Sequence, residues 1–252
     1  MIKAFKMALL TTLITISGFA SAEIDAELVE RAKQGDANAQ FLLGFAYDMG
    51  EVVPEDNKDA VKWYRLAAEQ GFSMAQFNLG LMYDNGEGVP EDNKEAVKWF
   101  RLAAEQGFAD AQYNLGLAYV IGNGVPEDGK EAVKWFRLAA EQGSFMAQHN
   151  LGVMYANGNG VPEDGKEAVK WYRLAAEQGS AASQNNLGVA YAFGNGVPED
   201  TVIAYAWANL AGANGYDVTM IKESLEQSMS SEDKSEAQKL TRQMMKDFPD
   251  IY

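Results

Sequence analysis

The segment 122–131, GNGVPEDGKE, contains the G-x-x-x-x-G-K part of a nucleotide-binding phosphate loop, and 160–166 repeats the pattern. A phosphate loop needs consecutive backbone N–H donors and a hydroxyl side chain that holds magnesium. Pro126 removes one of these donors, and Glu131 occupies the position of the hydroxyl residue. The residues before the loop also have the period of a helix rather than of a strand. We therefore expect this segment to be a turn between helices.

Two further patterns resemble catalytic groups. Ser231-x-x-Lys234 matches the first motif of serine β-lactamases, but the sequence lacks the accompanying K-T-G and S-D-N motifs, and the serine lies at a helix start. His149 is the single histidine, and the nearest serine in the sequence, Ser144, lies in a turn between helices. The sequence therefore places no obvious nucleophile beside a base. We expect a protein without catalytic residues, and not an enzyme.

The sequence also argues against a metal or cofactor site. There is no cysteine, which excludes thiolate ligands and disulfides, and one histidine cannot form a multi-histidine site. Five Glu-Asp pairs lack the spacing of a calcium-binding loop and precede helices, where acids are expected. The pairs are Glu55/Asp56, Glu91/Asp92, Glu127/Asp128, Glu163/Asp164 and Glu199/Asp200. We expect neither a metal nor a cofactor.

The overall charge narrows the choice of partner. The formal net charge of the 252 residues is −15. An acidic surface repels phosphate backbones and anionic lipid head groups, so we expect no nucleic-acid partner and no binding to a membrane surface.

The N-terminus has the pattern of an export signal over 1–22. Lys3 and Lys6 precede an apolar run over 7–19, and the small residues Ala20-Ser21-Ala22 follow it. The run is shorter than the ~20 residues that a membrane span needs, which makes a retained anchor the weaker alternative. We expect a periplasmic or secreted protein that is not inserted in a membrane after signal cleavage.

The strongest signal in the sequence is a repeat of 36 residues. The tryptophans lie at this spacing over five units, and so do five prolines, five glycines and five tyrosines. The tryptophans are Trp63, Trp99, Trp135, Trp171 and Trp207. A fixed period in this range indicates stacked units of two or three elements, each of which buries its apolar face against its neighbours.

Each unit reads as two helices. In the segment 109–121, apolar residues recur at i, i+4, i+7 and i+8 from Ala111, which is the period of a helix. The second helix begins at Asp128, and we expect Glu131 to complete a capping box with it. Gly143 stands where a glycine would end this helix.

These residues carry a resemblance to a known family. The pattern A-x-x-x-L-G-x-x-Y…G-x-G-V-x-x-D…A-x-x-W-x-x-x-A-A-x-x-G resembles the Sel1-like repeat family, a relative of the tetratricopeptide repeats, over 39–215. The resemblance implies an all-α fold, a right-handed α-solenoid superhelix of antiparallel helix pairs. Two units depart from the pattern. Val52 replaces a loop glycine in the first, and Thr201-Val202-Ile203 replace the capping and charged positions in the fifth.

The expected organisation has four parts. They are a signal peptide over 1–22, an N-terminal capping helix over 23–35, five Sel1-like repeats over 36–215, and C-terminal capping helices over 216–252. In the last part, Asp217–Ser228 and Glu232–Asp247 read as amphipathic helices, the second started by Ser230 with Asp233. We expect them to cover the apolar helix 201–214.

The candidate site is one side of the first helices of the repeats. On a helical wheel, residues 41 and 48 point away from Ala39 and Leu43, and the resemblance to tetratricopeptide arrays implies that this side lines a concave groove. The candidates are Phe41, Phe77, Asn78, Tyr113, Asn114, His149, Asn150, Asn185 and Asn186. Aromatic and amide side chains suit an extended peptide, whose backbone the asparagines would bind. Two alternatives stay open: the variable positions are unconstrained, or the asparagines hold adjacent repeats together.

We therefore expect a non-catalytic scaffold or adaptor in the periplasm or outside the cell, with a protein or extended peptide bound along the concave face. The alternative is a hydrolase of β-lactam or cell-wall substrates. It rests only on association with the cysteine-rich branch of the family, whose disulfides this chain cannot form.

Overall fold

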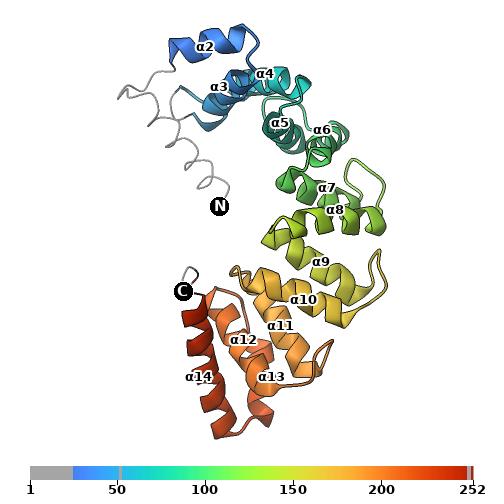
Figure 1. The fold of residues 1–252 in the computed structure, drawn as a ribbon, viewed down its shortest axis with the longest axis vertical. Coiled ribbons are helices and arrows are strands. Elements are labelled where there is room, and N and C mark those ends of the chain that lie inside the picture. The colour runs from blue at the N-terminus through green and yellow to red at the C-terminus, as the bar shows by residue number, and fades with distance from the viewer. Residues whose placement is uncertain (1–24, 51–52, 249–250, 252) are drawn as a thin grey trace.

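The computed structural model describes residues 25–50, 53–248 and 251, so the expected signal peptide and Val52 lie outside the described residues. Within these ranges the chain forms only helices (Figure 1). They are α2 (Ala26–Lys33), α3 (Ala37–Met49), α4 (Asn57–Glu69), α5 (Ser73–Asn85), α6 (Asn93–Glu105), α7 (Ala109–Ile121), α8 (Gly129–Glu141), α9 (Phe145–Asn157), α10 (Gly165–Ala176), α11 (Ala181–Phe193), α12 (Thr201–Ala213), α13 (Thr219–Ser228) and α14 (Ser231–Asp247).

The helices α3 to α12 form five pairs, which confirms the expected all-α solenoid. We call the odd-numbered members, α3 to α11, the first helices and the even-numbered members, α4 to α12, the second helices. Each of α4, α6, α8 and α10 packs both on the first helix of its own repeat and on the first helix of the next. The pairs follow one another along an arc whose two ends turn toward the same side (Figure 1). The long loops between the paired helices project from the outer side of this arc in α7–α12.

Close contact between the two helices of a repeat depends on a glycine. A Cβ atom at Gly116 would lie 2.6 Å from the ring of Phe136, and one at Gly80 would lie 2.6 Å from the ring of Phe100. The aromatic ring of the second helix therefore lies directly on the backbone of the first. Trp135 then packs against an apolar cluster that includes Phe100 and Leu115, so the core continues from repeat to repeat.

The segment that resembles a phosphate loop is a turn between helices, as expected. Gly124 has a φ of +72°, and a Cβ atom there would lie 2.1 Å from the carbonyl oxygen of Asn93, at the start of the preceding second helix. The glycine is needed both for its left-handed backbone and for this contact with the neighbouring repeat. The match to the phosphate-loop pattern follows from the packing of one repeat on the next.

The start of α8 differs from the expected capping box in one respect. The Asp128 carboxylate accepts hydrogen bonds from the backbone N–H groups of Lys130 and Glu131, at 2.9 and 3.2 Å, as a helix cap does. The Glu131 carboxylate does not return to Asp128 but pairs with Lys134, at 3.2 Å. A lysine one turn later competes for the glutamate, so only the aspartate half of the expected box forms.

A buried row of glutamines, which the sequence reading did not single out, joins the helices. Gln112 is 3% exposed, its Nε2 donates to the carbonyl oxygen of Ala104 over 3.1 Å, and its Oε1 accepts from Gln142 over 2.7 Å. One side chain thereby connects α6, α7 and the end of α8. Gln40, Gln76 and Gln148 make the same pair of bonds in their repeats.

The C-terminal end of the array is covered by two helices, α13 and α14, that lie outside the repeats. Ser230 and Asp233 form a complete capping box at the start of α14, as the sequence predicts. The Asn209 side chain in α12 donates to Thr241 of α14 over 3.1 Å, and Tyr205 of α12 donates to Glu226 of α13 over 2.6 Å. The two C-terminal helices therefore cover the apolar helix α12, as expected.

Candidate protein-binding surface

The aromatic candidates on the first helices contact the second helix of their own repeat. The ring centroids of Phe77 and Phe100 lie 5.8 Å apart, and those of Tyr113 and Phe136 lie 5.9 Å apart. Phe41 packs on Tyr64 at 5.9 Å and is only 3% exposed. The expectation that residue 41 points away from the core is therefore wrong, because Phe41 fills the space between α3 and α4. Phe77 and Tyr113 are half-buried, so part of each remains on the surface.

His149 has a partner that the sequence reading missed. Its Nδ1 lies 2.8 Å from the Oγ of Ser183, which belongs to the next repeat, and its ring lies 5.9 Å from that of Tyr172. Burial lowers the pKa of His149 from its ordinary value of 6.5, so the ring is neutral at pH 7. The other described repeats have alanine in place of Ser183, as at Ala147. A comparison of equivalent positions between repeats could have found this pair.

The pair of His149 and Ser183 is a contact between repeats. Ser183 is 0% exposed, and its hydroxyl also contacts Ser180 at 3.1 Å. A nucleophile must reach its substrate, and this hydroxyl is sealed inside the interface between α9 and α11. The other catalytic pattern, Ser231-x-x-Lys234, forms the first turn of α14, where Lys234 donates its backbone N–H to the carbonyl oxygen of Ser230 over 3.1 Å.

The asparagines of the first helices have two kinds of partner. A hydrogen bond from Asn150 lowers the pKa of Tyr113, although burial raises it by more, and Asn186 acts on Tyr172 in the same way. These two asparagines hydrogen-bond to a tyrosine of the preceding repeat, which favours the interpretation that they hold adjacent repeats together. Asn114 instead donates to the carbonyl oxygen of Asp110 within its own helix, over 2.8 Å.

Asn78 and Asn185 are half-buried side chains on α5 and α11. Asn185 occupies the place of His149 in the fifth repeat. Binding by any of the candidate residues stays a prediction, because their positions describe packing and exposure but no ligand.

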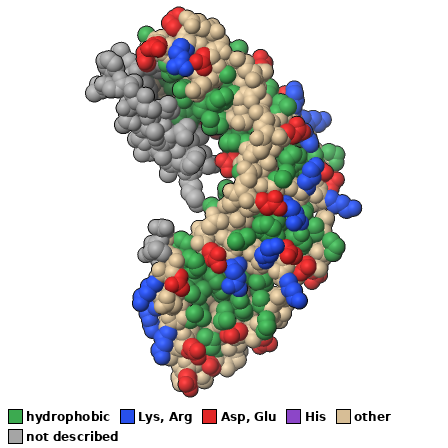
Figure 2. All heavy atoms as spheres, in the orientation of Figure 1, with side chains coloured by type: hydrophobic (Ala, Val, Ile, Leu, Met, Phe, Trp, Pro, Cys, Tyr) green, Lys and Arg blue, Asp and Glu red, His purple; other side chains and the backbone are tan. Residues whose placement is uncertain are grey.

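The first helices present a surface of distinct composition. None of the five contains a lysine or arginine, whereas α4, α6, α8 and α10 carry three each. Basic and acidic side chains follow the arc together on the face shown in Figure 2. Both sets of helices expose apolar groups, but the most exposed of those on the repeats lie on the first helices, with Ile121 67% exposed and Phe193 65%, against 38–40% for Leu66, Leu102, Leu138 and Leu174 on the second helices. We call the exposed side of α3, α5, α7, α9 and α11 the first-helix surface.

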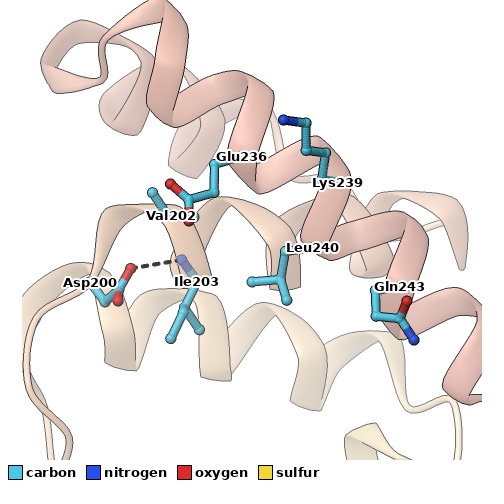
Figure 3. Close-up of a pocket in the computed structure, with 7 residues that line it drawn as sticks. All are labelled: Asp200, Val202, Ile203, Glu236, Lys239, Leu240 and Gln243. Atoms are coloured by element: carbon cyan, nitrogen blue, oxygen red, sulfur yellow. Dashed lines mark hydrogen bonds between the residues drawn. The ribbon is translucent and has the colours of Figure 1, made fainter.

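A hollow lies at the C-terminal end of the array, between the start of α12 and α14 (Figure 3). It is lined by Asp200, Val202, Ile203, Glu236, Lys239, Leu240 and Gln243. The Asp200 carboxylate is occupied by the backbone N–H of Ile203, at 2.9 Å. In the repeats before it, the loop of the following repeat contacts the equivalent helix start, as Gly196 contacts Gly165. The hollow is therefore the place that a sixth repeat would cover.

Two kinds of site are missing from the part of the chain that the structure describes. Its residues bring together no group of three or more histidine, aspartate or glutamate side chains that could hold a metal ion. None of its helices has the length and apolar character needed to cross a membrane.

Comparisons with known proteins agree on the type of repeat. A family model described as Sel1 repeat matches residues 37–72, 73–108, 109–144, 145–180 and 181–216. No curated protein matches the chain. The chain is 37% identical to a protective antigen of uropathogenic Escherichia coli strains that displays an SLR fold, with a TM-score of 0.80 over 89% of this chain and 49% of the antigen. It therefore spans about half the length of that antigen.

A second solved structure matches along nearly its whole length. The chain is 36% identical to a Sel1 repeat protein from Oxalobacter formigenes, with a TM-score of 0.73 over 86% of this chain and 97% of that one.

Proposed function

This chain belongs to the Sel1-repeat family, and on that basis we propose that it is an exported scaffold that binds a protein segment on its first-helix surface. Sel1-repeat proteins are generally scaffolds for protein–protein interaction. The proposal adds the location outside the cytoplasm, the surface used and the form of the partner, an extended segment of another protein.

The observation that carries the proposal is a contrast between two parts of the repeat. The segments 122–144 and 158–180 differ at one position, Phe136 against Tyr172, whereas the first helices of the same two repeats, α7 and α9, differ at many. Among the differences are exposed positions, such as Ile121 in α7. Repeat proteins present a binding surface in this way: the residues that hold the repeats together stay the same, and the exposed residues vary from repeat to repeat.

Site-specific photocrosslinking tests the surface. A photoreactive amino acid replaces Asn78 or Asn114 on the first helices, and in matched controls it replaces the exposed Leu102 or Leu138 on the second helices. The proposal expects crosslinks to one partner from the first-helix positions and not from the controls. Crosslinks from the second-helix positions alone would contradict it.

Export needs a separate experiment. A reporter enzyme that is active only outside the cytoplasm is fused after Tyr252, with and without residues 1–22. Because residues 1–22 have the pattern of an export signal, we expect the reporter to be active in the full fusion and inactive in the fusion that lacks them. Equal activity of both fusions would contradict export through this segment.

A further inference from the structure

The charge of the first-helix surface changes along the array. At the position of Asp84, the repeats carry Asp48, Asp84, Val120, Ala156 and Ala192 in order. Three residues later in the sequence, the order is Glu51, Glu87, Asn123, Asn159 and Asn195. The first two repeats are therefore acidic at places where the last three are neutral.

Asp84 and Asp48 have different residues opposite them on the second helix of their repeat. The hydroxyl of Tyr64 donates to the Asp48 carboxylate over 3.0 Å. In the second repeat the place of Tyr64 is taken by Phe100, which has no hydroxyl. Among the described residues, Asp84 has no hydrogen-bond or ion-pair partner, and burial together with the nearby Glu91 raises its pKa. A half-buried carboxylate next to a second acid would be stabilised by a cation. The absence of lysine and arginine from the first helices leaves no basic group on them to compensate the charge of Asp84.

The other end of the surface is apolar. Ile121 and Phe193 end the first helices of the third and fifth repeats, and each exposes about two thirds of its surface. The same position is Asn85 in the second repeat and Asn157 in the fourth. Burial of these two large apolar side chains by a partner would favour binding, because it removes apolar surface from water.

We propose that the partner segment carries lysine or arginine at one end, which lies against Asp84 in the second repeat, and apolar side chains at the other, which cover Ile121 and Phe193 in the third and fifth repeats. This inference rests on the proposed function and specifies the chemistry of the partner. The charge complementarity also orients the segment along the array, because only one direction places its basic end at the second repeat. The net charge of −15 steers a basic segment toward the protein before contact.

The test uses three fluorescent peptides of about a dozen residues, a length that covers several repeats when extended. All share an apolar half with leucine and phenylalanine, and the other half contains lysine, glutamine or glutamate. Fluorescence anisotropy measures their binding to the full mature protein. We expect the lysine peptide to bind about tenfold more tightly than the glutamine peptide, and the glutamate peptide to bind least.

Variants taken from the chain's own repeats locate the two ends. Asp84→Val places the residue of the third repeat in the second, and Ile121→Asn and Phe193→Asn place the residue of the fourth repeat in the third and fifth. We expect Asp84→Val to weaken the lysine peptide about tenfold and to leave the glutamine peptide unchanged, and the asparagine variants to weaken both. The matched controls Glu105→Gln and Leu102→Asn remove one charge and one exposed apolar group from the second helices.

Three results would overturn the inference. Equal binding of the lysine and glutamine peptides that still falls in Ile121→Asn would refute the basic end and leave docking on this surface intact. An equal loss in Glu105→Gln and Asp84→Val would show attraction by overall charge. Binding of none of the peptides would refute the proposed chemistry, and crosslinking from Asn78 and Asn114 would then decide separately whether the surface docks a protein.

Discussion

Gln112 and Gln142 are 30 residues apart in the sequence, and their side chains meet in a hydrogen bond of 2.7 Å. The donor, Gln142, ends α8, and the acceptor, Gln112, is buried near the start of α7. Because Gln112 also donates to the preceding repeat at Ala104, the pair fixes the relative position of three helices. The arc of the array is therefore determined partly by polar contacts and not by apolar packing alone.

Replacement of Gln112 by leucine should destabilise the array. The substitution puts an apolar side chain of similar size in place of the amide and leaves the carbonyl oxygen of Ala104 buried without its partner, which costs about 1–3 kcal/mol. Urea unfolding followed by circular dichroism measures the loss. The control Gln142→Leu changes the exposed member of the pair and should cost less. Equal stability of Gln112→Leu and the unmodified protein would contradict this role.

Gly116→Ala should overpack the contact between α7 and α8. The added methyl group would lie 2.6 Å from the ring of Phe136, and such overpacking costs about 1–3 kcal/mol. The matched control is Gly188→Ala in the fifth repeat, where the nearest atom to the added methyl group is the carbonyl oxygen of Ala204 at 3.2 Å. We expect the midpoint temperature of thermal unfolding to fall less in this control than in Gly116→Ala. A second change, Phe136→Leu, should recover part of the loss in Gly116→Ala. If Phe136→Leu restores none of the lost stability, the strain does not arise from the contact between residues 116 and 136.

The architecture is predictable from the sequence because the same pattern of apolar residues, glycines and helix caps recurs in the repeats. The helix 109–121 and the cap at Asp128 are found at their expected positions, since the glycines, prolines and caps that bound them depend only on neighbouring residues. The closing helices were also predictable, because Ser230 and Asp233 are three residues apart. Local chemistry with a fixed period leaves little to be decided by tertiary contacts.

The candidate site was less predictable, for a physical reason. A helical wheel separates the two sides of one helix, but Phe41 is buried by the ring of Tyr64, which lies on a different helix. His149 and Ser183 likewise belong to different repeats. Contacts between helices depend on how the helices cross, and the period of a single helix carries no information on that.

The loop that resembles a phosphate-binding motif gives a third prediction. Gly124→Ala should destabilise the protein by about 2 kcal/mol or more, because an alanine with φ near +72° is strained by about 1–2 kcal/mol and its methyl group would overlap the carbonyl group of Asn93. Lys130→Ala, the exposed lysine of the same motif, should leave stability unchanged within about 0.5 kcal/mol. Differential scanning fluorimetry measures both. A thermal shift of the unmodified protein with Mg-ATP that disappears in Lys130→Ala would instead restore the phosphate-loop interpretation.

The contact between His149 and Ser183 should make stability depend on pH. Burial lowers the pKa of His149 in the folded protein below 6.5, so the unfolded chain binds a proton more readily than the folded one. The stabilisation is thus fully present above pH 6.5 and is lost as the pH falls from 6.5 toward the lower pKa of the folded state. Urea unfolding at a series of pH values should show this loss, by at most about 1.4 kcal/mol for each unit of difference between the two pKa values. His149→Asn, which places the residue of the fifth repeat in the fourth, should remove this component, whereas Ser183→Ala should lower stability and retain a pH-dependent slope. An unchanged slope in His149→Asn would assign the pH dependence to the carboxylates instead.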